Sequence, residues 1–271
     1  FSIVSSKGVS GSHLGRKYGF EHSTTDTISV INNKEINTVL ITTRHNSHAE
    51  LIIQALRAGK KVYVEKPLCL NPQELKQIVD VYTSLQDEGQ NPFLMVGFNR
   101  RFAPHIKKIK KLLSGSREPK SMIMTVNAGH ISAEHWTQDL SVGGGRLIGE
   151  ACHFIDLLRY IAGTKIDSVY STVCSGENFG ECNDTFTVTL VFKNGSIGSL
   201  HYFSNGIKSI PKERLEIFSG GRVLQLDNFR RLVGRGWEGF SKMNLWAQVK
   251  GHFTEMNELV DAISNGNISP I

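Results

Sequence analysis

The stretch VYVEKPL, residues 62–68, places a charged pair and a proline directly after a short apolar run. The apolar residues predict a buried strand, so Glu65 and Lys66 stand where that strand leaves the sheet. In an open parallel sheet, the C-terminal ends of the strands line the ligand crevice. Pro67 fixes its own φ and restricts the backbone of Lys66. This lysine can therefore direct its ammonium at a substrate hydroxyl or carbonyl; the alternative is a surface Glu-Lys pair in an ordinary turn.

A second apolar run, residues 36–43, precedes this strand, and a helical pattern lies between the two. Ser47 and Glu50 have the spacing of a capping box, which predicts the start of the helix. The pattern ends at Gly59, a typical helix stop. Residues 36–66 therefore predict a strand–helix–strand unit of about the thirty residues that such a unit requires.

The chain as a whole shows two different patterns. Over residues 1–100, apolar strands alternate with helices, which predicts a parallel sheet and a nucleotide-binding domain. Beyond Pro119, alternating apolar residues and hairpin turns such as Asn194-Gly195 predict an antiparallel sheet. Residues 101–271 are therefore expected to form an α+β domain with a large, mostly antiparallel sheet. We expect a homo-oligomer through this sheet, because a second copy can cover the face that its own helices leave open.

Composition excludes several classes of protein. Of the 271 residues, 39% are hydrophobic and 21% charged, as in an ordinary globular chain. The net charge is +6, but the basic residues are scattered apart from a cluster at 107–111, which fits one solvated helix face better than a nucleic-acid stripe. No apolar run approaches the roughly 18 residues of a membrane helix. We therefore expect neither nucleic acid nor a membrane as partner.

The cysteines argue against a metal site. Their positions contain no C-x-x-C pair, so zinc is not expected, and their small number in a long chain fits thiols in a reducing cytoplasm. No secretory signal opens the chain. The cysteines are Cys69, Cys152, Cys174 and Cys182.

A second chemically informative stretch, GGGRLIGEACHFID, spans residues 143–156. It predicts a helix on which His153 and Asp156 share a face. Glu150 lies one turn before His153, close enough to hydrogen-bond it. A histidine oriented by a carboxylate suits proton transfer near neutral pH. The alternative is a surface histidine with acidic neighbours.

These stretches, with TTRHNSH at residues 42–48, resemble the Gfo/Idh/MocA oxidoreductases, which oxidise or reduce sugars and cyclitols with NAD(P). The resemblance implies an incomplete Rossmann-type domain followed by the α+β domain. It also implies that Lys66 polarises the substrate oxygen and contacts the nicotinamide side. The other residues expected to line the NAD or NADP cofactor are Ser5, Thr42, Thr43, His48 and Glu65.

In the second half, His153 falls on the family's catalytic histidine and Asp156 on the aspartate that follows it. The family often has an aspartate four residues before the histidine, where this chain has Gly149, and Glu150 can replace it. The segments at 97–102 and 127–136 resemble regions that face the family's active site. The substrate-binding residues expected on this basis are Asn99, Arg101, His130, Trp136 and Asp156.

Two of these residues have a chemistry that suits such a substrate. Arg101 can hold an acidic or polyhydroxyl group through its planar donors, and Trp136 can stack on a sugar ring. The alternatives are a surface arginine and a buried tryptophan.

The resemblance covers nearly the whole chain but not the family's ends. The first strand and the glycine-rich phosphate loop are expected to precede Phe1, and the pattern continues past Ile271. The stretch GRGWEG at 234–239 matches the dinucleotide fingerprint, but it follows antiparallel strands and no helical pattern starts after it, so we do not interpret it as a phosphate loop.

The sequence thus predicts an NAD(P)-dependent oxidoreductase that transfers a hydride between nicotinamide and a hydroxyl or carbonyl carbon of a sugar, nucleotide sugar or cyclitol. Two alternatives stay open: an NAD-dependent glycosidase of the same family, and a non-catalytic regulator that senses dinucleotide or sugar. NAD and NADP also stay open, since Ser5, Ser6 and Lys7 occupy the expected ribose-reading loop, where an acidic residue would favour NAD.

Overall fold

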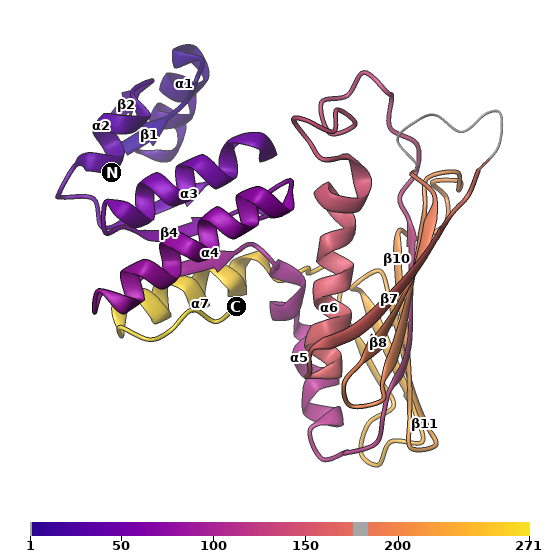
Figure 1. The fold of residues 1–271 in the computed structure, drawn as a ribbon. Coiled ribbons are helices and arrows are strands. Elements are labelled where there is room, and N and C mark those ends of the chain that lie inside the picture. Colours follow the sequence, from indigo (N-terminus) through magenta and orange to yellow (C-terminus); the bar gives the residue numbers. More distant parts are fainter. Residues whose placement is uncertain (1, 176–183) are drawn as a thin grey trace. The chain divides into compact units, whose positions relative to one another are not determined.

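The computed structural model describes residues 2–175 and 184–271 (Figure 1). It divides the chain into two units, Phe1–Val96 with Ala262–Ile271, and Gly97–Asp261. Each unit contains a hydrophobic core of its own. Phe1 and Cys182, which the sequence analysis named, lie outside the described residues.

The first unit contains parallel strands connected by helices, as predicted. Its strands form two separate sheets, one of β1 and β2 and one in the order β3-β4-β5. The strands are β1 (Ser2–Val4), β2 (His22–Thr24), β3 (Thr38–Ile41), β4 (Lys61–Val64) and β5 (Leu94–Val96). The helices are α1 (Gly8–Tyr18), α2 (Thr27–Asn32), α3 (His48–Arg57), α4 (Pro72–Asp87) and the end of α7 (His252–Ser264).

Local signals explain how α4 begins. Asn71 is its N-cap, and the Oδ1 of Asn71 accepts a hydrogen bond of 2.9 Å from the backbone N–H of Glu74. Pro72 occupies the first turn, where its missing N–H costs nothing. The carboxylate of Glu74 accepts in return from the backbone N–H of Leu70, at 2.8 Å. These contacts satisfy N–H groups that the helix start leaves without intrahelical partners.

The capping box expected at Ser47 and Glu50 is wrong. The Oγ of Ser47 donates to the backbone oxygen of Arg44 at 2.8 Å and lies 2.6 Å from the Oγ1 of Thr43. A 3-10 turn, η1 (His45–Ser47), precedes α3, and the Ser47 hydroxyl bonds within this turn instead of capping the helix. Glu50 instead accepts from the side chain of Gln54, one turn later.

The second unit is built on an eight-stranded sheet in the order β13-β12-β11-β10-β6-β9-β8-β7. All neighbours are antiparallel except β6 and β9, which confirms the mostly antiparallel prediction. The strands are β6 (Ser121–Asn127), β7 (Ile166–Val173), β8 (Phe186–Phe192), β9 (Ile197–Phe203), β10 (Glu213–Ser219), β11 (Arg222–Asp227), β12 (Arg231–Arg235) and β13 (Lys242–Asn244).

Two helices cover one face of this sheet (Figure 1). They are α5 (Pro104–Leu113) and α6 (Cys152–Ala162), each preceded by a short turn, η2 (Asn99–Phe102) and η3 (Leu147–Ala151), the latter π-helical. Strand β8 shows why the sheet has an inner face, because its alternate residues are buried against the helices. The sequence GRGWEG begins within β12 rather than after a parallel strand, which agrees with its rejection as a phosphate loop.

A buried ion cluster joins η2 to the sheet. The Nε and Nη2 of Arg100 donate to the carboxylate of Glu213 at 2.9 and 2.8 Å, and the Nζ of Lys250 donates to it at 2.6 Å. Burial by itself raises the pKa of Glu213, but the hydrogen bonds and charge of Arg100 and Lys250 outweigh it, so this pKa lies below its usual value. Glu213 is therefore ionised inside the unit.

Replacing Arg100 by methionine should destabilise this unit by about 3–5 kcal/mol at pH 7, because it leaves a buried carboxylate undercompensated. Urea unfolding measures the loss. Lys107→Met is the control, since its pair with Glu258 is 46% and 43% exposed, and it should cost about 1 kcal/mol or less.

The pH dependence follows from the lowered pKa of Glu213. The wild-type protein should lose this contribution only as the pH falls below about 4.3, the unfolded-state value, toward the folded-state pKa. Equal losses for the Arg100 and Lys107 variants would contradict the structural role of the cluster.

Candidate active site

The carboxyl end of β4 holds the Glu-Lys-Pro sequence of the first unit. The backbone N–H of Glu65 donates to Ile41 at the end of β3, at 2.9 Å, so the strands remain paired up to this residue. The hydroxyl of Tyr63 donates to the carboxylate of Glu65 at 3.2 Å. Lys66 follows at the strand end and is partly buried, and the Lys66–Pro67 peptide is cis.

His48 connects this segment to the preceding loop. Its ring is fully buried, with Nδ1 2.7 Å from the backbone oxygen of Pro67 and Nε2 3.2 Å from that of Thr43. Carbonyl oxygens only accept hydrogen bonds, so whichever ring nitrogen of His48 carries a proton donates a hydrogen bond to the carbonyl oxygen beside it. The imidazole therefore fixes the backbone next to Lys66 against the loop after β3. Direct contact between His48 and a cofactor stays a prediction.

The other residues expected at the cofactor follow parallel strands. Thr42 and Thr43 are exposed directly after β3. Ser5 follows β1, and its hydroxyl lies 2.9 Å from the backbone oxygen of Lys7 and 2.7 Å from the Oγ of Ser10. The carboxyl ends of β1, β3 and β4, the edge at which open α/β sheets bind their ligands, thus carry hydroxyl and charged groups. Contact of these residues with a dinucleotide stays a prediction.

In the second unit, His153 lies in the first turn of α6. Its side chain is buried, and the ring of Phe98 meets it edge-on with centroids 6.0 Å apart. The π-helical turn η3 leads directly into this helix. Such turns are frequent at functional sites.

Two residues predicted to bind substrate are paired with each other. The guanidinium of Arg101 forms a bidentate contact with the carboxylate of Asp156, whose Oδ2 accepts from Nε at 2.7 Å and whose Oδ1 accepts from Nη2. It also lies 5.1 Å from the centre of the Tyr160 ring. Burial raises the pKa of Asp156, and Arg101 offsets part of that effect. Arg101 is thus not the surface arginine of the alternative interpretation; it links η2 to α6.

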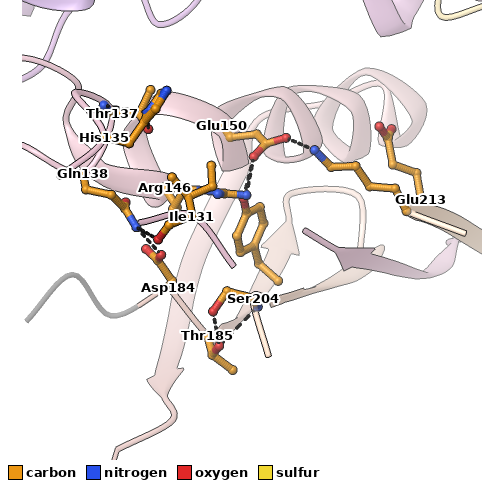
Figure 2. A network of polar contacts seen from close by, with 12 residues as sticks. Ile131, His135, Thr137, Gln138, Arg146, Glu150, Asp184, Thr185, Ser204 and Glu213 are labelled. Carbon is orange, nitrogen blue, oxygen red and sulfur yellow. Dashed lines mark hydrogen bonds and ion pairs between the residues drawn. The ribbon is translucent and has the colours of Figure 1, made fainter. Parts of the chain in front are cut away.

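The expected hydrogen bond between Glu150 and His153 is wrong. The Oε1 of Glu150 accepts from the Nζ of Lys212 at 2.6 Å, and its Oε2 accepts from the hydroxyl of Tyr202 at 2.5 Å and from the Nη2 of Arg146 at 2.9 Å (Figure 2). The carboxylate of Glu150 thus accepts from Lys212, Tyr202 and Arg146 rather than from His153.

This cluster determines the charge of Glu150. Burial alone would raise its pKa, but the Lys212 ammonium, the Tyr202 hydroxyl and Arg146 together lower the pKa to about 2. Glu150 is therefore a fixed anion near neutral pH. It does not exchange a proton there.

The remaining predicted residues lie apart from these clusters. The side-chain N–H of Asn99 donates to the backbone oxygen of Lys250 at 2.8 Å. His130 is exposed. Trp136 is partly buried and its ring centre lies 5.9 Å from that of His135. Contact of these three with a substrate stays a prediction.

Sequence reasoning missed Arg146, Tyr202 and Lys212. Only Arg146 carried a local signal, because it stands four residues before Glu150 and can reach it along the helical turn. Tyr202 and Lys212 come from β9 and the loop after it, and no motif connects them with Glu150. Within residues 2–175 and 184–271, no group of three His, Cys, Asp or Glu side chains could hold a metal ion, and no helix is long and apolar enough to span a membrane.

The chain is similar in sequence to known dehydrogenases. A myo-inositol 2-dehydrogenase from Thermotoga maritima is 29% identical over 222 residues, which cover 80% of this chain and 64% of the relative. A levoglucosan dehydrogenase from Pseudarthrobacter phenanthrenivorans is 32% identical over 166 residues, 58% of this chain and 41% of the relative. The chain thus spans less than two thirds of the length of these relatives.

Solved structures share the fold. A levoglucosan dehydrogenase in complex with NADH and levoglucosan has a TM-score of 0.84 at 24% identity, covering 99% of this chain and 81% of that one. A probable dehydrogenase from Thermotoga maritima has a TM-score of 0.81 at 22% identity, covering 100% and 83%.

Two family models match the chain, one in each half. Residues 2–88 match the model described as "Oxidoreductase family, NAD-binding Rossmann fold", and residues 118–219 match the "GFO/IDH/MocA C-terminal domain". Together they cover well over half of the chain. It contains the NAD-binding Rossmann domain and the C-terminal domain of one family, and therefore belongs to the Gfo/Idh/MocA oxidoreductases.

Proposed function

We propose that this protein is an NAD(P)-dependent oxidoreductase that acts on a CH–OH group of a sugar, nucleotide sugar or cyclitol. The observation that carries the proposal is Lys66, which stands at the carboxyl end of a parallel strand on a backbone fixed by His48. The named relatives, inositol and levoglucosan dehydrogenases, support net oxidation over the glycosidase and sensor alternatives.

The residues after the parallel strands fit a nicotinamide dinucleotide. Ser5, Thr42, Thr43 and Glu65 supply hydroxyl and carboxylate groups for ribose and amide contacts, and they follow β1, β3 and β4. When bound, the cofactor accepts or donates the hydride. Oxidation of an alcohol also releases a proton, and a protein group must take it.

Lys66 and His153 share the proton and charge chemistry. The Lys66 ammonium polarises the substrate oxygen, which favours the alkoxide character that hydride loss requires. His153 is the general base for oxidation and the general acid for reduction. Glu150 cannot take this role near neutral pH, because its pKa of about 2 keeps it ionised. Arg101 and Asp156 position α6 through their ion pair.

Lys66→Ala in the full-length protein should lower kcat/KM by about a hundredfold or more, because a positioned electrostatic group is lost. The fold should persist, since the side chain of Lys66 is only partly buried. Steady-state kinetics with inositols and anhydrosugars, and with both NAD and NADP, measures the effect. Lys76→Ala is the control on the exposed face of α4. Wild-type turnover in Lys66→Ala would refute the assignment.

His153→Asn should lower kcat by about a hundredfold or more and leave the dissociation constant of the cofactor unchanged, because a general acid–base group is lost. Kinetics and calorimetric cofactor titration separate the two quantities. His201→Asn is the control, a partly buried β9 histidine whose ring bonds Thr187. Loss of cofactor affinity with an intact chemical step would show that the role of His153 is misassigned.

We also propose that two copies associate through the outer face of the eight-stranded sheet. Helices cover the inner face, while Ile123, Ile197 and Phe218 are 36%, 47% and 41% exposed on the outer one. The strand register places these residues on a common face, since Ile197 and Phe218 both pair with Ser121 on β6. A symmetric copy presents the same apolar patch.

Ile123→Lys should convert the oligomer into monomer, because a two-fold axis would bring two ammonium groups into an apolar interface. Light scattering coupled to gel filtration measures the mass. Ile28→Lys, at a 63% exposed position on α2, should leave the oligomer intact. A monomeric wild-type protein at micromolar concentration would rule out this interface.

A further inference from the structure

We propose that Lys212 binds an oxyanion of the substrate, either a carboxylate or a phosphate. The inference rests on the proposed function and names the substrate class for it. Lys212 stands at the end of the β9–β10 loop, and its ammonium contacts Glu150, one helical turn before His153. A group that meets this ammonium is therefore close to the first turn of α6.

Lys212 is the accessible cation of the Glu150 cluster. Its side chain is 37% exposed, whereas that of Arg146 is 3% exposed. An ammonium carries three N–H donors, and one of them donates to Glu150. The ion pair with Glu150 holds the ammonium in one place, and the side chain of Lys212 stays partly exposed to solvent.

Within the two ion clusters of Glu150 and Glu213, the cations outnumber the carboxylates. Glu150 is paired with both Arg146 and Lys212, and Glu213, the chain neighbour of Lys212, is paired with both Arg100 and Lys250. Each carboxylate neutralises one cation and leaves one positive charge over. Excess positive charge at a partly buried site attracts an anion.

Aromatic contacts place the two ion clusters side by side. The guanidinium of Arg100 lies 4.7 Å from the centre of the Phe154 ring, and that of Arg146 lies 5.3 Å from the centre of the Tyr202 ring. The Phe154 and Tyr202 rings are themselves 6.5 Å apart. Arg100 therefore lies against the first turn of α6, which carries His153, and Arg146 lies against the neighbouring Tyr202 ring.

Arg146 gives a second, independent indication. Its Nε donates to the hydroxyl of Tyr202 and its Nη2 to Glu150, but its buried Nη1 has no acceptor among the residues that the structure describes. A buried donor without an acceptor is costly. The cluster thus has more donors and positive charge than its own acceptors satisfy.

The loop that carries Lys212 is held in place before any ligand arrives. The side-chain N–H of Asn127 donates to the backbone oxygens of Ile207 and Ile210 at 2.8 and 3.1 Å. The backbone N–H of Asn127 donates to the backbone oxygen of Lys212 at 2.8 Å. A Cβ at Gly206 would lie 2.0 Å from the Oδ1 of Asn127, so glycine permits this approach. Preorganisation of this kind lowers the entropy cost of binding.

An oxyanion fits these observations better than a neutral hydroxyl. A hydroxyl can accept a hydrogen bond from Lys212, but it leaves the excess positive charge in place. A carboxylate or phosphate accepts the same bond and also compensates the charge, because it forms an ion pair with the ammonium.

The test compares ligands that differ only in the acidic group, using the full-length protein with NAD and NADP. Glucuronate and glucose 6-phosphate are compared with glucose, and inositol 1-phosphate with myo-inositol. Either the carboxylate ligand or the phosphate ligands should have a kcat/KM at least ten times that of the neutral counterpart. The group that gives this increase identifies the oxyanion that Lys212 binds. Lys212→Met should remove this preference, mainly through KM, by lowering kcat/KM at least tenfold more for the acidic ligand than for its neutral counterpart.

Two variants separate recognition from structural damage. Lys212→Arg keeps the charge and should retain the preference, whereas Lys193→Met, at an exposed position beyond β8, should change nothing. If Lys212→Met weakens acidic and neutral substrates equally, or if the wild-type protein prefers the neutral ones, the inference is overturned.

Calorimetric titration of the same ligands gives a result that does not depend on turnover. Acid-selective binding that Lys212→Met abolishes would support the inference even if no ligand were oxidised, in which case only the proposed function would fail. Absence of acid-selective binding would refute the inference, whether or not neutral sugars are turned over.

Discussion

Two carboxylates, each paired with two cations, join the segments around His153 to the large sheet. Glu150, which is partly buried, lies just before α6, and the fully buried Glu213 binds Arg100 of η2. Glu150 is held by Lys212, Arg146 and Tyr202, and Glu213 by Arg100 and Lys250. Buried ions are expensive to desolvate, so such clusters are stable only when the partners are in place. Such clusters also fix the positions of their members, because a small displacement breaks several charge-assisted hydrogen bonds at once. A helix anchored in this way presents its first turn with little freedom.

The parts of the fold that could be predicted from the sequence are those that depend on interactions between neighbouring residues. The start of α4 can be predicted from Asn71, Pro72 and Glu74, because their capping contacts involve only neighbouring residues. Strict alternation in β8 and the Asn194-Gly195 turn predicted a hairpin, because period-two patterns and left-handed glycine are local properties. The short strands β2, β12 and β13 were missed, since their pairing depends on neighbours in the sheet rather than on their own composition.

The candidate site divides in the same way. Lys66 could be placed at a strand end and His153 on a helix, because those positions follow from nearby residues. The role of Glu150 could not, since helical spacing shows which side chains it can reach but not which donors compete for it. Tyr202 and Lys212 are 52 and 62 residues away along the chain. Residues 101 and 156 show the same limit, because local sequence does not reveal distant partners. Arg101 and Asp156 were each expected to bind substrate, and the structure pairs them with each other.

The missing aspartate at Gly149 can now be given a physical interpretation. A carboxylate at position 150 projects to a different side of the turn from one at 149, and here it meets the sheet. There it accepts from three donors and keeps its charge, with a pKa of about 2. It therefore contributes electrostatics and rigidity rather than proton exchange. In the mechanism that we propose, His153 therefore carries the proton transfer, and Lys212, which Glu150 holds in place, is left to bind the substrate. On this proposal, a carboxylate at position 150 instead of 149 assigns substrate recognition and proton transfer to different side chains.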